Sequence, residues 1–208
     1  MKYYYSIESG TTEKTVIKKS VFIASAFPIE SAEEAEIAVG RIKREYYDAT
    51  HNCYAYIAGG NEARFSDDGE PQGTAGLPIL SVLKKRGLNK ILVIVTRYFG
   101  GVKLGAAGLV SAYSESALNV LNGADIKKYV YSSELKLRFD YSFINAADGV
   151  LKDFGENVKV CGAEYSENVL YSVFAAEDFC DSFKSALVER TNGLIAIEDG
   201  EKGYRALT

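Results

Sequence analysis

Two glycine-rich segments hold the residues of this chain whose types and spacing could support binding or catalysis. The first is SDDGEPQGTAGLP (residues 66–78) and the second is RYFGGVKLGAAGL (residues 97–109). Eight of the chain's 19 glycines fall within residues 69–108. Because glycine costs conformational entropy, this clustering indicates a need for positive φ or for close approach of a ligand or another backbone. Both segments also carry charge, so together they predict a functional surface.

The basic segment, residues 97–109, follows a strand-like run and precedes a helix-like one. That order directs the free N–H groups of a helix N-terminus away from the sheet, and with Arg97 and Lys103 nearby it favours an anion such as phosphate or carboxylate. The segment matches neither the Walker pattern nor GxGxxG. Two other interpretations stay open. The glycines could only allow tight helix packing, with Arg97 paired to Asp67 or Asp68, or the segment could contact a protein partner.

The acidic segment, residues 66–78, places Asp67, Asp68 and Glu70 within four residues. Carboxylate oxygens suit magnesium or calcium, but EF-hand spacing is absent and no second acidic cluster is visible, so we expect no metal. A paired-carboxylate acid/base site is a second interpretation, for which the sequence identifies no substrate. The structural alternative is turn chemistry, in which the aspartates accept hydrogen bonds from local N–H groups.

His51 is the chain's one histidine, and it stands just before a strand-like run. A lone histidine is more often structural, but its place near the loops makes it a candidate for the same surface. The cysteines Cys53, Cys161 and Cys180 form no CxxC pair, so we expect buried, reduced thiols and no zinc site. No GxSxG elbow is present. The sequence therefore predicts no catalytic residue and no cofactor.

Length and charge limit the class of protein. A chain of 208 residues suits one large or two small domains. No apolar run reaches the roughly 20 residues that a membrane span requires, and the start resembles no signal peptide, so we expect a cytoplasmic protein without a membrane partner. Residues 1–130 carry 16 basic and 14 acidic side chains (net +2), and residues 131–208 carry 8 and 14 (net −6). Since phosphate contacts rely on lysine and arginine, any nucleic acid should bind the first part.

The elements that must position these residues follow from periodicity. For the first part we expect strands within 3–29 and at 52–58 and 91–96, and helices at 31–48, 78–87 and 106–121. Residues 91–96 form a β-branched run typical of a strand covered on both faces. Residues 59–77 show no periodicity and predict a long loop that is either functional or disordered. Residues 124–131 predict the junction between two domains.

The second part shows a complete pattern of its own. We expect strands at 135–139, 158–165, 168–174 and 194–197, and helices at 143–154 and 178–189. The resulting order, βαββαβ, is typical of the split-βαβ, ferredoxin-like arrangement.

Four motifs resemble the YigZ/IMPACT family in its bacterial two-domain form. They are KKSVFIA (18–24), HNCYAY (51–56), FSDDGEPQGTAGLPIL (65–80) and TRYFGGVKLGAAGLVSAY (96–113). One departure is Ala106-Ala107, where we would expect a further glycine. With the domain order, the resemblance covers essentially the whole chain.

The resemblance implies an α+β fold, an α/β sandwich with two domains. Residues 1–130 would form an IMPACT-type N-terminal domain similar to domain 2 of ribosomal protein S5. Residues 131–208 would form a ferredoxin-like domain similar to those of elongation factor G.

The family also implies a role in translation. Eukaryotic relatives regulate translation initiation by competing for the activator of a stress-responsive kinase, a pathway that bacteria lack and that does not transfer to this two-domain form. We expect a non-enzymatic, translation-associated regulator that binds RNA, the ribosome or a translation factor through the N-terminal glycine-rich surface. The alternative is an enzyme acting on a small phosphorylated or nucleotide substrate, with Asp67 or Asp68 as metal ligand or base and Arg97 on the phosphate. The predicted binding surface comprises His51, Asp67, Asp68, Glu70, Gly73, Thr74, Gly76, Arg97, Tyr98, Gly100, Gly101, Lys103 and Gly105.

Overall fold

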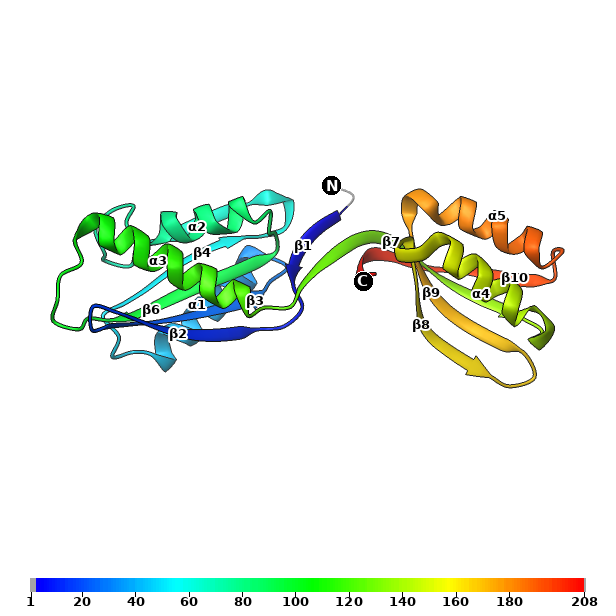
Figure 1. The fold of residues 1–208 in the computed structure, drawn as a ribbon, viewed down its shortest axis with the longest axis horizontal. Coiled ribbons are helices and arrows are strands. Elements are labelled where there is room, and N and C mark those ends of the chain that lie inside the picture. The colour runs from blue at the N-terminus through cyan, green and yellow to red at the C-terminus, as the bar shows by residue number, and fades with distance from the viewer. Residues whose placement is uncertain (1–2, 208) are drawn as a thin grey trace. The chain divides into compact units, whose positions relative to one another are not determined.

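The computed structural model describes residues 3–207, which divide into two compact units (Figure 1). The N-terminal unit is Tyr5–Lys127, and the C-terminal unit is the chain from Lys128 together with Tyr3 and Tyr4. Each unit combines helices with an antiparallel sheet. The described chain therefore has an α+β fold.

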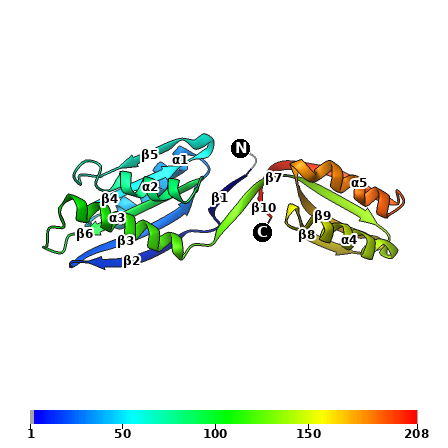
Figure 2. The same cartoon turned by 45° about the horizontal axis from the view of Figure 1, so that its top comes forward.

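The sheet of the N-terminal unit has the strand order β2-β3-β6-β4-β5, and every pairing is antiparallel. Its strands are β2 (Thr11–Ile17), β3 (Ser20–Pro28), β4 (His51–Ile57), β5 (Ala63–Ser66) and β6 (Ile91–Tyr98). Helices α1 (Ala32–Glu45), α2 (Gly76–Lys85) and α3 (Gly105–Asn122) complete the unit. Helices α2 and α3 lie side by side over the sheet (Figures 1 and 2).

The central strand β6 is buried on both faces, as its β-branched run predicts. Ile91, Val93 and Val95 belong to the core cluster that includes residues of α2 and α3. Leu92 and Ile94 belong to the separate cluster that includes residues of α1. Because side chains alternate between the faces of a strand, odd-numbered positions of β6 face α2 and α3. At the end of β6, the same alternation places Arg97 on the side of α2 and α3 and Tyr98 on the side of α1.

Two helix starts in this unit differ in how they are capped. Ser31 caps α1, where its hydroxyl accepts a hydrogen bond from the Glu34 N–H at 3.2 Å, and the Glu34 side chain accepts from the Glu30 N–H at 2.8 Å. The Ser31 bond is the first half of a capping box, but the second half differs, because Glu34 binds the N–H of Glu30 and not that of Ser31. Helix α2 begins at Gly76, two residues before Pro78, and it has a different cap described below.

In the C-terminal unit, β7 pairs with β9 and β10, and β9 pairs with β8. Strand β1 (Tyr3–Ile7), whose first two residues belong to this unit, also pairs with β7. The remaining elements are β7 (Ile126–Phe139), α4 (Ile144–Phe154), β8 (Val158–Tyr165), β9 (Val169–Ala176), α5 (Cys180–Arg190) and β10 (Ile195–Ala206). Helices α4 and α5 lie on the same face of the sheet, where their apolar residues pack against β7 and β9 (Figure 1).

The structure corrects three sequence expectations. Strand β7 begins at Ile126, well before the expected start at 135, so the boundary between the two units at Lys127 and Lys128, which lies within the expected junction 124–131, falls inside a continuous strand. Strand β5 occupies part of the expected loop 59–77, and β10 is far longer than the expected 194–197. Among residues 3–207, no helix is both long and apolar enough to span a membrane.

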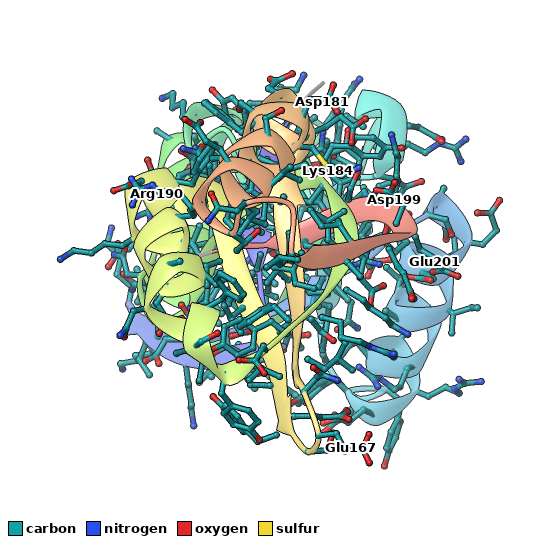
Figure 3. The ribbon with its side chains drawn as sticks, turned by 90° about the vertical axis from the view of Figure 1, so that its right-hand side faces the viewer. Glu167, Asp181, Lys184, Arg190, Asp199 and Glu201 are labelled. Carbon is teal, nitrogen blue, oxygen red and sulfur yellow. The ribbon has the colours of Figure 1, made fainter. Side chains whose placement is uncertain are left out.

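Figure 3 labels four acidic side chains of the C-terminal unit, which are Glu167, Asp181, Asp199 and Glu201. Glu167 is exposed in the turn between β8 and β9, and Glu201 is exposed on β10. Two cations of this unit are bound in ion pairs, since Lys184 pairs with Asp199 and Arg190 pairs with Asp153. Residues 131–208 also carry a net charge of −6. The C-terminal unit is therefore the poorer surface for phosphate.

Candidate functional site

The two glycine-rich segments meet in a buried ion pair. Arg97, at the end of β6, has its Nη1 2.6 Å from Oε1 of Glu70 in the acidic segment, and the side chains are 6% and 4% exposed. The Tyr113 hydroxyl of α3 donates to the same oxygen at 2.8 Å. Arg97 thus pairs with Glu70, and not with Asp67 or Asp68 as one interpretation of the sequence proposed. The pair neutralises both charges within the protein.

The rest of the Arg97 guanidinium lies among aromatic rings. Its central carbon is 5.5 Å from the ring centroid of Phe22 and 5.6 Å from that of Phe99, within the range of cation–π attraction. Nη2 lies 3.4 Å from the Ser20 hydroxyl oxygen. Nε is buried and has no hydrogen-bond partner in the described chain. One N–H donor of this side chain is therefore unused.

His51 lies directly across from Arg97 in the pairing of β4 with β6. Its Nδ1 is 2.8 Å from the Asp68 carbonyl oxygen, which can only accept, so Nδ1 carries a proton. In the neutral ring Nε2 is then an acceptor, and it lies 3.9 Å from Oε2 of Glu70, too far for a direct hydrogen bond. Two acceptors thus face one another across a gap.

Asp67 closes the acidic segment onto the start of α2. Its Oδ1 accepts from the N–H groups of Ala75 at 3.1 Å and Gly76 at 2.9 Å, and its Oδ2 accepts from Gly73 N–H at 2.8 Å. The N-terminal N–H groups of a helix have no partner within the helix, so this carboxylate acts as their cap. Within the same loop, the hydroxyl of buried Thr74 donates to the Pro71 carbonyl at 2.6 Å. Asp67 therefore has a structural role.

Asp68 is also engaged by the protein. Its Oδ2 accepts from the Asn52 N–H at 2.7 Å, and its Oδ1 forms an ion pair with Lys43 at 2.5 Å. Its backbone has φ +43°, which Asp tolerates better than most residues. No group of three His, Cys, Asp or Glu side chains suited to a metal ion occurs in residues 3–207.

Two glycines of the segments allow backbones to approach closely. A Cβ added at Gly100 would lie 2.0 Å from the Lys19 carbonyl carbon, and one at Gly76 would lie 2.6 Å from the Ser66 carbonyl oxygen. The first contact brings the basic segment against the turn between β2 and β3, and Gly100 N–H donates to the Ser20 hydroxyl at 3.2 Å. The predicted positions Gly73, Gly101 and Gly105 all have φ between +72° and +81°.

Above the ion pair lies a cavity of about 350 Å³. Its polar side chains include His51, Glu70 and Arg97, and Phe99 and Lys103 also line it. The other lining residues are Thr50, Pro71, Leu104, Gly105, Ala106 and Leu109. Leu104 occupies the N-cap position of α3 without a side-chain hydrogen bond, so the first N–H groups of this helix have no side-chain cap. The cavity thus adjoins a helix N-terminus.

Of the predicted site residues, His51, Glu70, Arg97, Lys103 and Gly105 line the cavity, whereas Tyr98 lies on the other side of the sheet. As an even-numbered position of β6, it is on the α1 side of the sheet. Its hydroxyl donates to Asp48 Oδ1 at 2.8 Å, and this hydrogen bond raises the pKa of Tyr98 to about 12. The adjacent Phe99 lines the cavity, although the predicted site residues did not include it.

Cys53, two residues after His51 on β4, does not offer a nucleophile to the site. Its Sγ is buried and donates to the Asp67 carbonyl oxygen at 3.0 Å. Burial raises the pKa of the Cys53 thiol to about 12, which removes the thiolate at neutral pH. Cys180 is also buried, but Cys161 is exposed on β8, contrary to the expectation that all three thiols are buried.

The chain belongs to the IMPACT family. The family model for the Impact N-terminal domain matches residues 18–121, which include every predicted site residue, and a domain of unknown function (DUF1949) matches residues 137–194. The resemblance proposed from the motifs is confirmed.

Individual relatives agree over nearly the full length. The chain is 36% identical over 203 residues to IMPACT family member YvyE of Bacillus subtilis, covering 97% of this chain and 93% of that protein. It is 33% identical over 190 residues to YigZ of Escherichia coli, covering 88% and 92%. A crystal structure described as a hypothetical protein aligns with TM-score 0.63 at 30% identity, covering 97% of this chain and 98% of that one.

Proposed function

We propose that this protein is a non-enzymatic, translation-associated factor whose N-terminal unit binds single-stranded RNA through the phosphate backbone. The observation that carries the proposal is a set of exposed lysines without ion-pair partners among the described residues, in the basic segment and in the turn between β2 and β3 that contacts it. Membership of the IMPACT family supports the link to translation, because eukaryotic members of the family regulate it. In the cytoplasm, the protein would bind this RNA either as a free strand or as part of the ribosome.

Three exposed lysines provide the positive charge. Lys18 and Lys19 form the turn between β2 and β3, whose backbone contacts Gly100, and Lys103 lies three residues beyond that glycine. None of the three has an ion-pair partner among the described residues. Arg97 cannot serve here, since Glu70 already neutralises it. Phosphate binding depends on such free lysines, and the N–H groups at the start of α3 would add to it.

The enzyme alternative has less support. It requires Asp67 or Asp68 as a metal ligand or base, yet both carboxylates bond to backbone N–H groups of their own unit. Moving either one onto a substrate would release those donors, two of which begin α2.

We also propose the finer fold assignments that the family implies. The N-terminal domain (residues 1–130) would be related to domain 2 of ribosomal protein S5, and the C-terminal domain (131–208) to the ferredoxin-like domains of elongation factor G. The βαββαβ order from β7 to β10 supports the second assignment.

Fluorescence anisotropy with a labelled single-stranded RNA over a series of KCl concentrations tests the proposal. We expect log K to fall linearly with log salt, with a slope of about −0.7 per phosphate contacted. The triple variant Lys18→Gln, Lys19→Gln, Lys103→Gln should bind more weakly and with a shallower slope. Its matched control is Lys84→Gln, Lys85→Gln, two exposed lysines of α2 in the same unit, which should bind as the unchanged protein does. Absence of salt-dependent binding together with absence of co-sedimentation with ribosomes would refute the proposal.

A further inference from the structure

We infer that the cavity above the Arg97–Glu70 pair is a binding site for one base of that RNA, turned out of the strand. The inference rests on the proposed function and adds to it, because lysines on the surface explain only contacts to phosphate. It assigns to the cavity a ligand class, a nucleobase, and names the atoms that would contact its edge.

The first argument is an unused donor. Arg97 is 5% exposed and lines the cavity, and its Nε has no hydrogen-bond partner in the described chain. Buried donors are nearly always paired, since leaving one without a partner is costly. Because Nε is itself buried, an acceptor atom on a ligand would reach it only if the lining side chains shifted, and the bond of Nη1 to Glu70 could stay intact.

The second argument is a pair of unused acceptors beside that donor. Glu70 uses Oε1 for Arg97 and Tyr113, so Oε2 stays available, and His51 presents Nε2 at 3.9 Å from it. An N–H group placed between them would bond to either atom. The cavity therefore offers a donor and acceptors together, as the edge of a nucleobase requires, and single-stranded RNA is read through such edges.

The third argument is that the side chains lining the cavity suit a flat, partly apolar ligand. Apart from these polar atoms, the lining is apolar and includes Phe99, Leu104, Leu109 and Pro71. Phe99 is 47% exposed, and the Arg97 guanidinium lies 5.6 Å from its ring centroid, so a flat heterocycle would find an aromatic face beside a buried guanidinium that Glu70 already neutralises. Stacking of bases on such side chains is the common mode of binding to single strands. The volume of about 350 Å³ is in the range of small-molecule sites and accommodates one base.

The fourth argument is continuity with the phosphate surface. Lys103 and the start of α3 line the same cavity, so a nucleotide whose base enters would leave its phosphate beside these groups. A free anion would have no use for Glu70, and an apolar ligand would have no use for Arg97 Nε. A nucleotide unit uses both.

The experiment compares two labelled RNAs of equal length and equal charge, one with normal bases and one abasic. We expect the abasic RNA to bind about 10-fold more weakly, within the range that one stacked base contributes, and with the same salt slope. Phe99→Leu should remove most of that difference. Phe65→Leu is the matched control, because Phe65 is similarly exposed, at 44%, on β5 of the same unit.

The outcomes separate this inference from the proposed function. If the abasic RNA binds as tightly and with the same salt dependence, the base site is refuted and the phosphate surface stands. If the abasic RNA binds more weakly but Phe99→Leu changes nothing, the base is bound elsewhere and the inference is wrong. If neither RNA binds, both the inference and the proposed function fail.

Discussion

The acidic and basic segments use their charges in opposite ways. In the acidic segment, Asp68 and Glu70 bond to other parts of the N-terminal unit, and Asp67 bonds to N–H groups of the segment itself. In the basic segment, Arg97 is buried, but Lys103 is exposed and has no ion-pair partner among the described residues. The acidic segment therefore builds the site, while the exposed part of the basic segment is available to a ligand. A cluster of charges in a sequence does not by itself distinguish these two uses.

The strongest test of this contrast is the buried pair. Arg97→Met should lower the free energy of unfolding by about 3–5 kcal/mol, because it leaves the Glu70 carboxylate buried without its counter-charge. The double variant Arg97→Met, Glu70→Gln should recover much of the loss. Urea unfolding followed by far-UV circular dichroism measures both. A single variant as stable as the unchanged protein would show that the pair is not structural.

Close approach of backbones should give the next largest effect. Gly100→Ala would place a methyl group 2.0 Å from the Lys19 backbone, so we expect a loss of about 3 kcal/mol, the upper end for overpacking. The control is Gly40→Ala within α1, where no atom lies within 4 Å of the added Cβ. This change should stabilise the helix by about 0.5–1 kcal/mol. Thermal unfolding measures both effects. A lower melting temperature for Gly100→Ala and a higher one for Gly40→Ala would support the close backbone contact at Gly100, and a shift of both in the same direction would contradict it.

The carboxylates of the acidic segment should differ from each other. Asp67→Ala removes the acceptors of three backbone N–H groups and should cost about 2 kcal/mol. Asp68→Ala, whose side chain is 25% exposed, should cost about 1 kcal/mol, because water can replace part of its bonds. If the two variants lowered the melting temperature equally, the cap that Asp67 provides for α2 would contribute no more to stability than the bonds of Asp68.

The smallest effect on stability should come from the exposed cation. Lys103→Gln should change the free energy of unfolding by less than about 0.5 kcal/mol, as is usual for surface positions. The same variant should reduce the salt slope of RNA binding by about 0.7. If Lys103→Gln were less stable but bound RNA as the unchanged protein does, Lys103 would have a structural role and no role in binding.

Much of the fold was accessible from the sequence. Apolar periodicity located the five helices of the described chain, and the β-branched run at 91–96 identified the central strand. Strand β5 (Ala63–Ser66) was missed because it is short and lies at the sheet edge, so its alternation of apolar and polar residues covers only four positions. The second half of β10 was missed for a different reason, because residues 198–203 are almost entirely polar.

The site was accessible only in part. Composition identified both segments, and the expectation that aspartates bond to local N–H groups is confirmed at Asp67. The partner of Arg97 was not predictable, because it depends on the path of a loop that Asp67 itself holds in place. Phe99 was left out of the site residues, although strand alternation puts it on the Arg97 side of the sheet and Tyr98 on the other.

The cross-strand position of Arg97 and His51 has a consequence for folding accuracy. If β6 paired with β4 one residue out of step, every side chain of β6 would change faces. The apolar positions from Ile91 to Val95 would tolerate that exchange, since both faces are buried and both accept aliphatic groups. Arg97 would not, because its guanidinium would leave Glu70 and lie against the apolar cluster beneath α1. Arg97 thus favours one pairing register of β6 with β4, which the aliphatic residues of β6 alone would not distinguish.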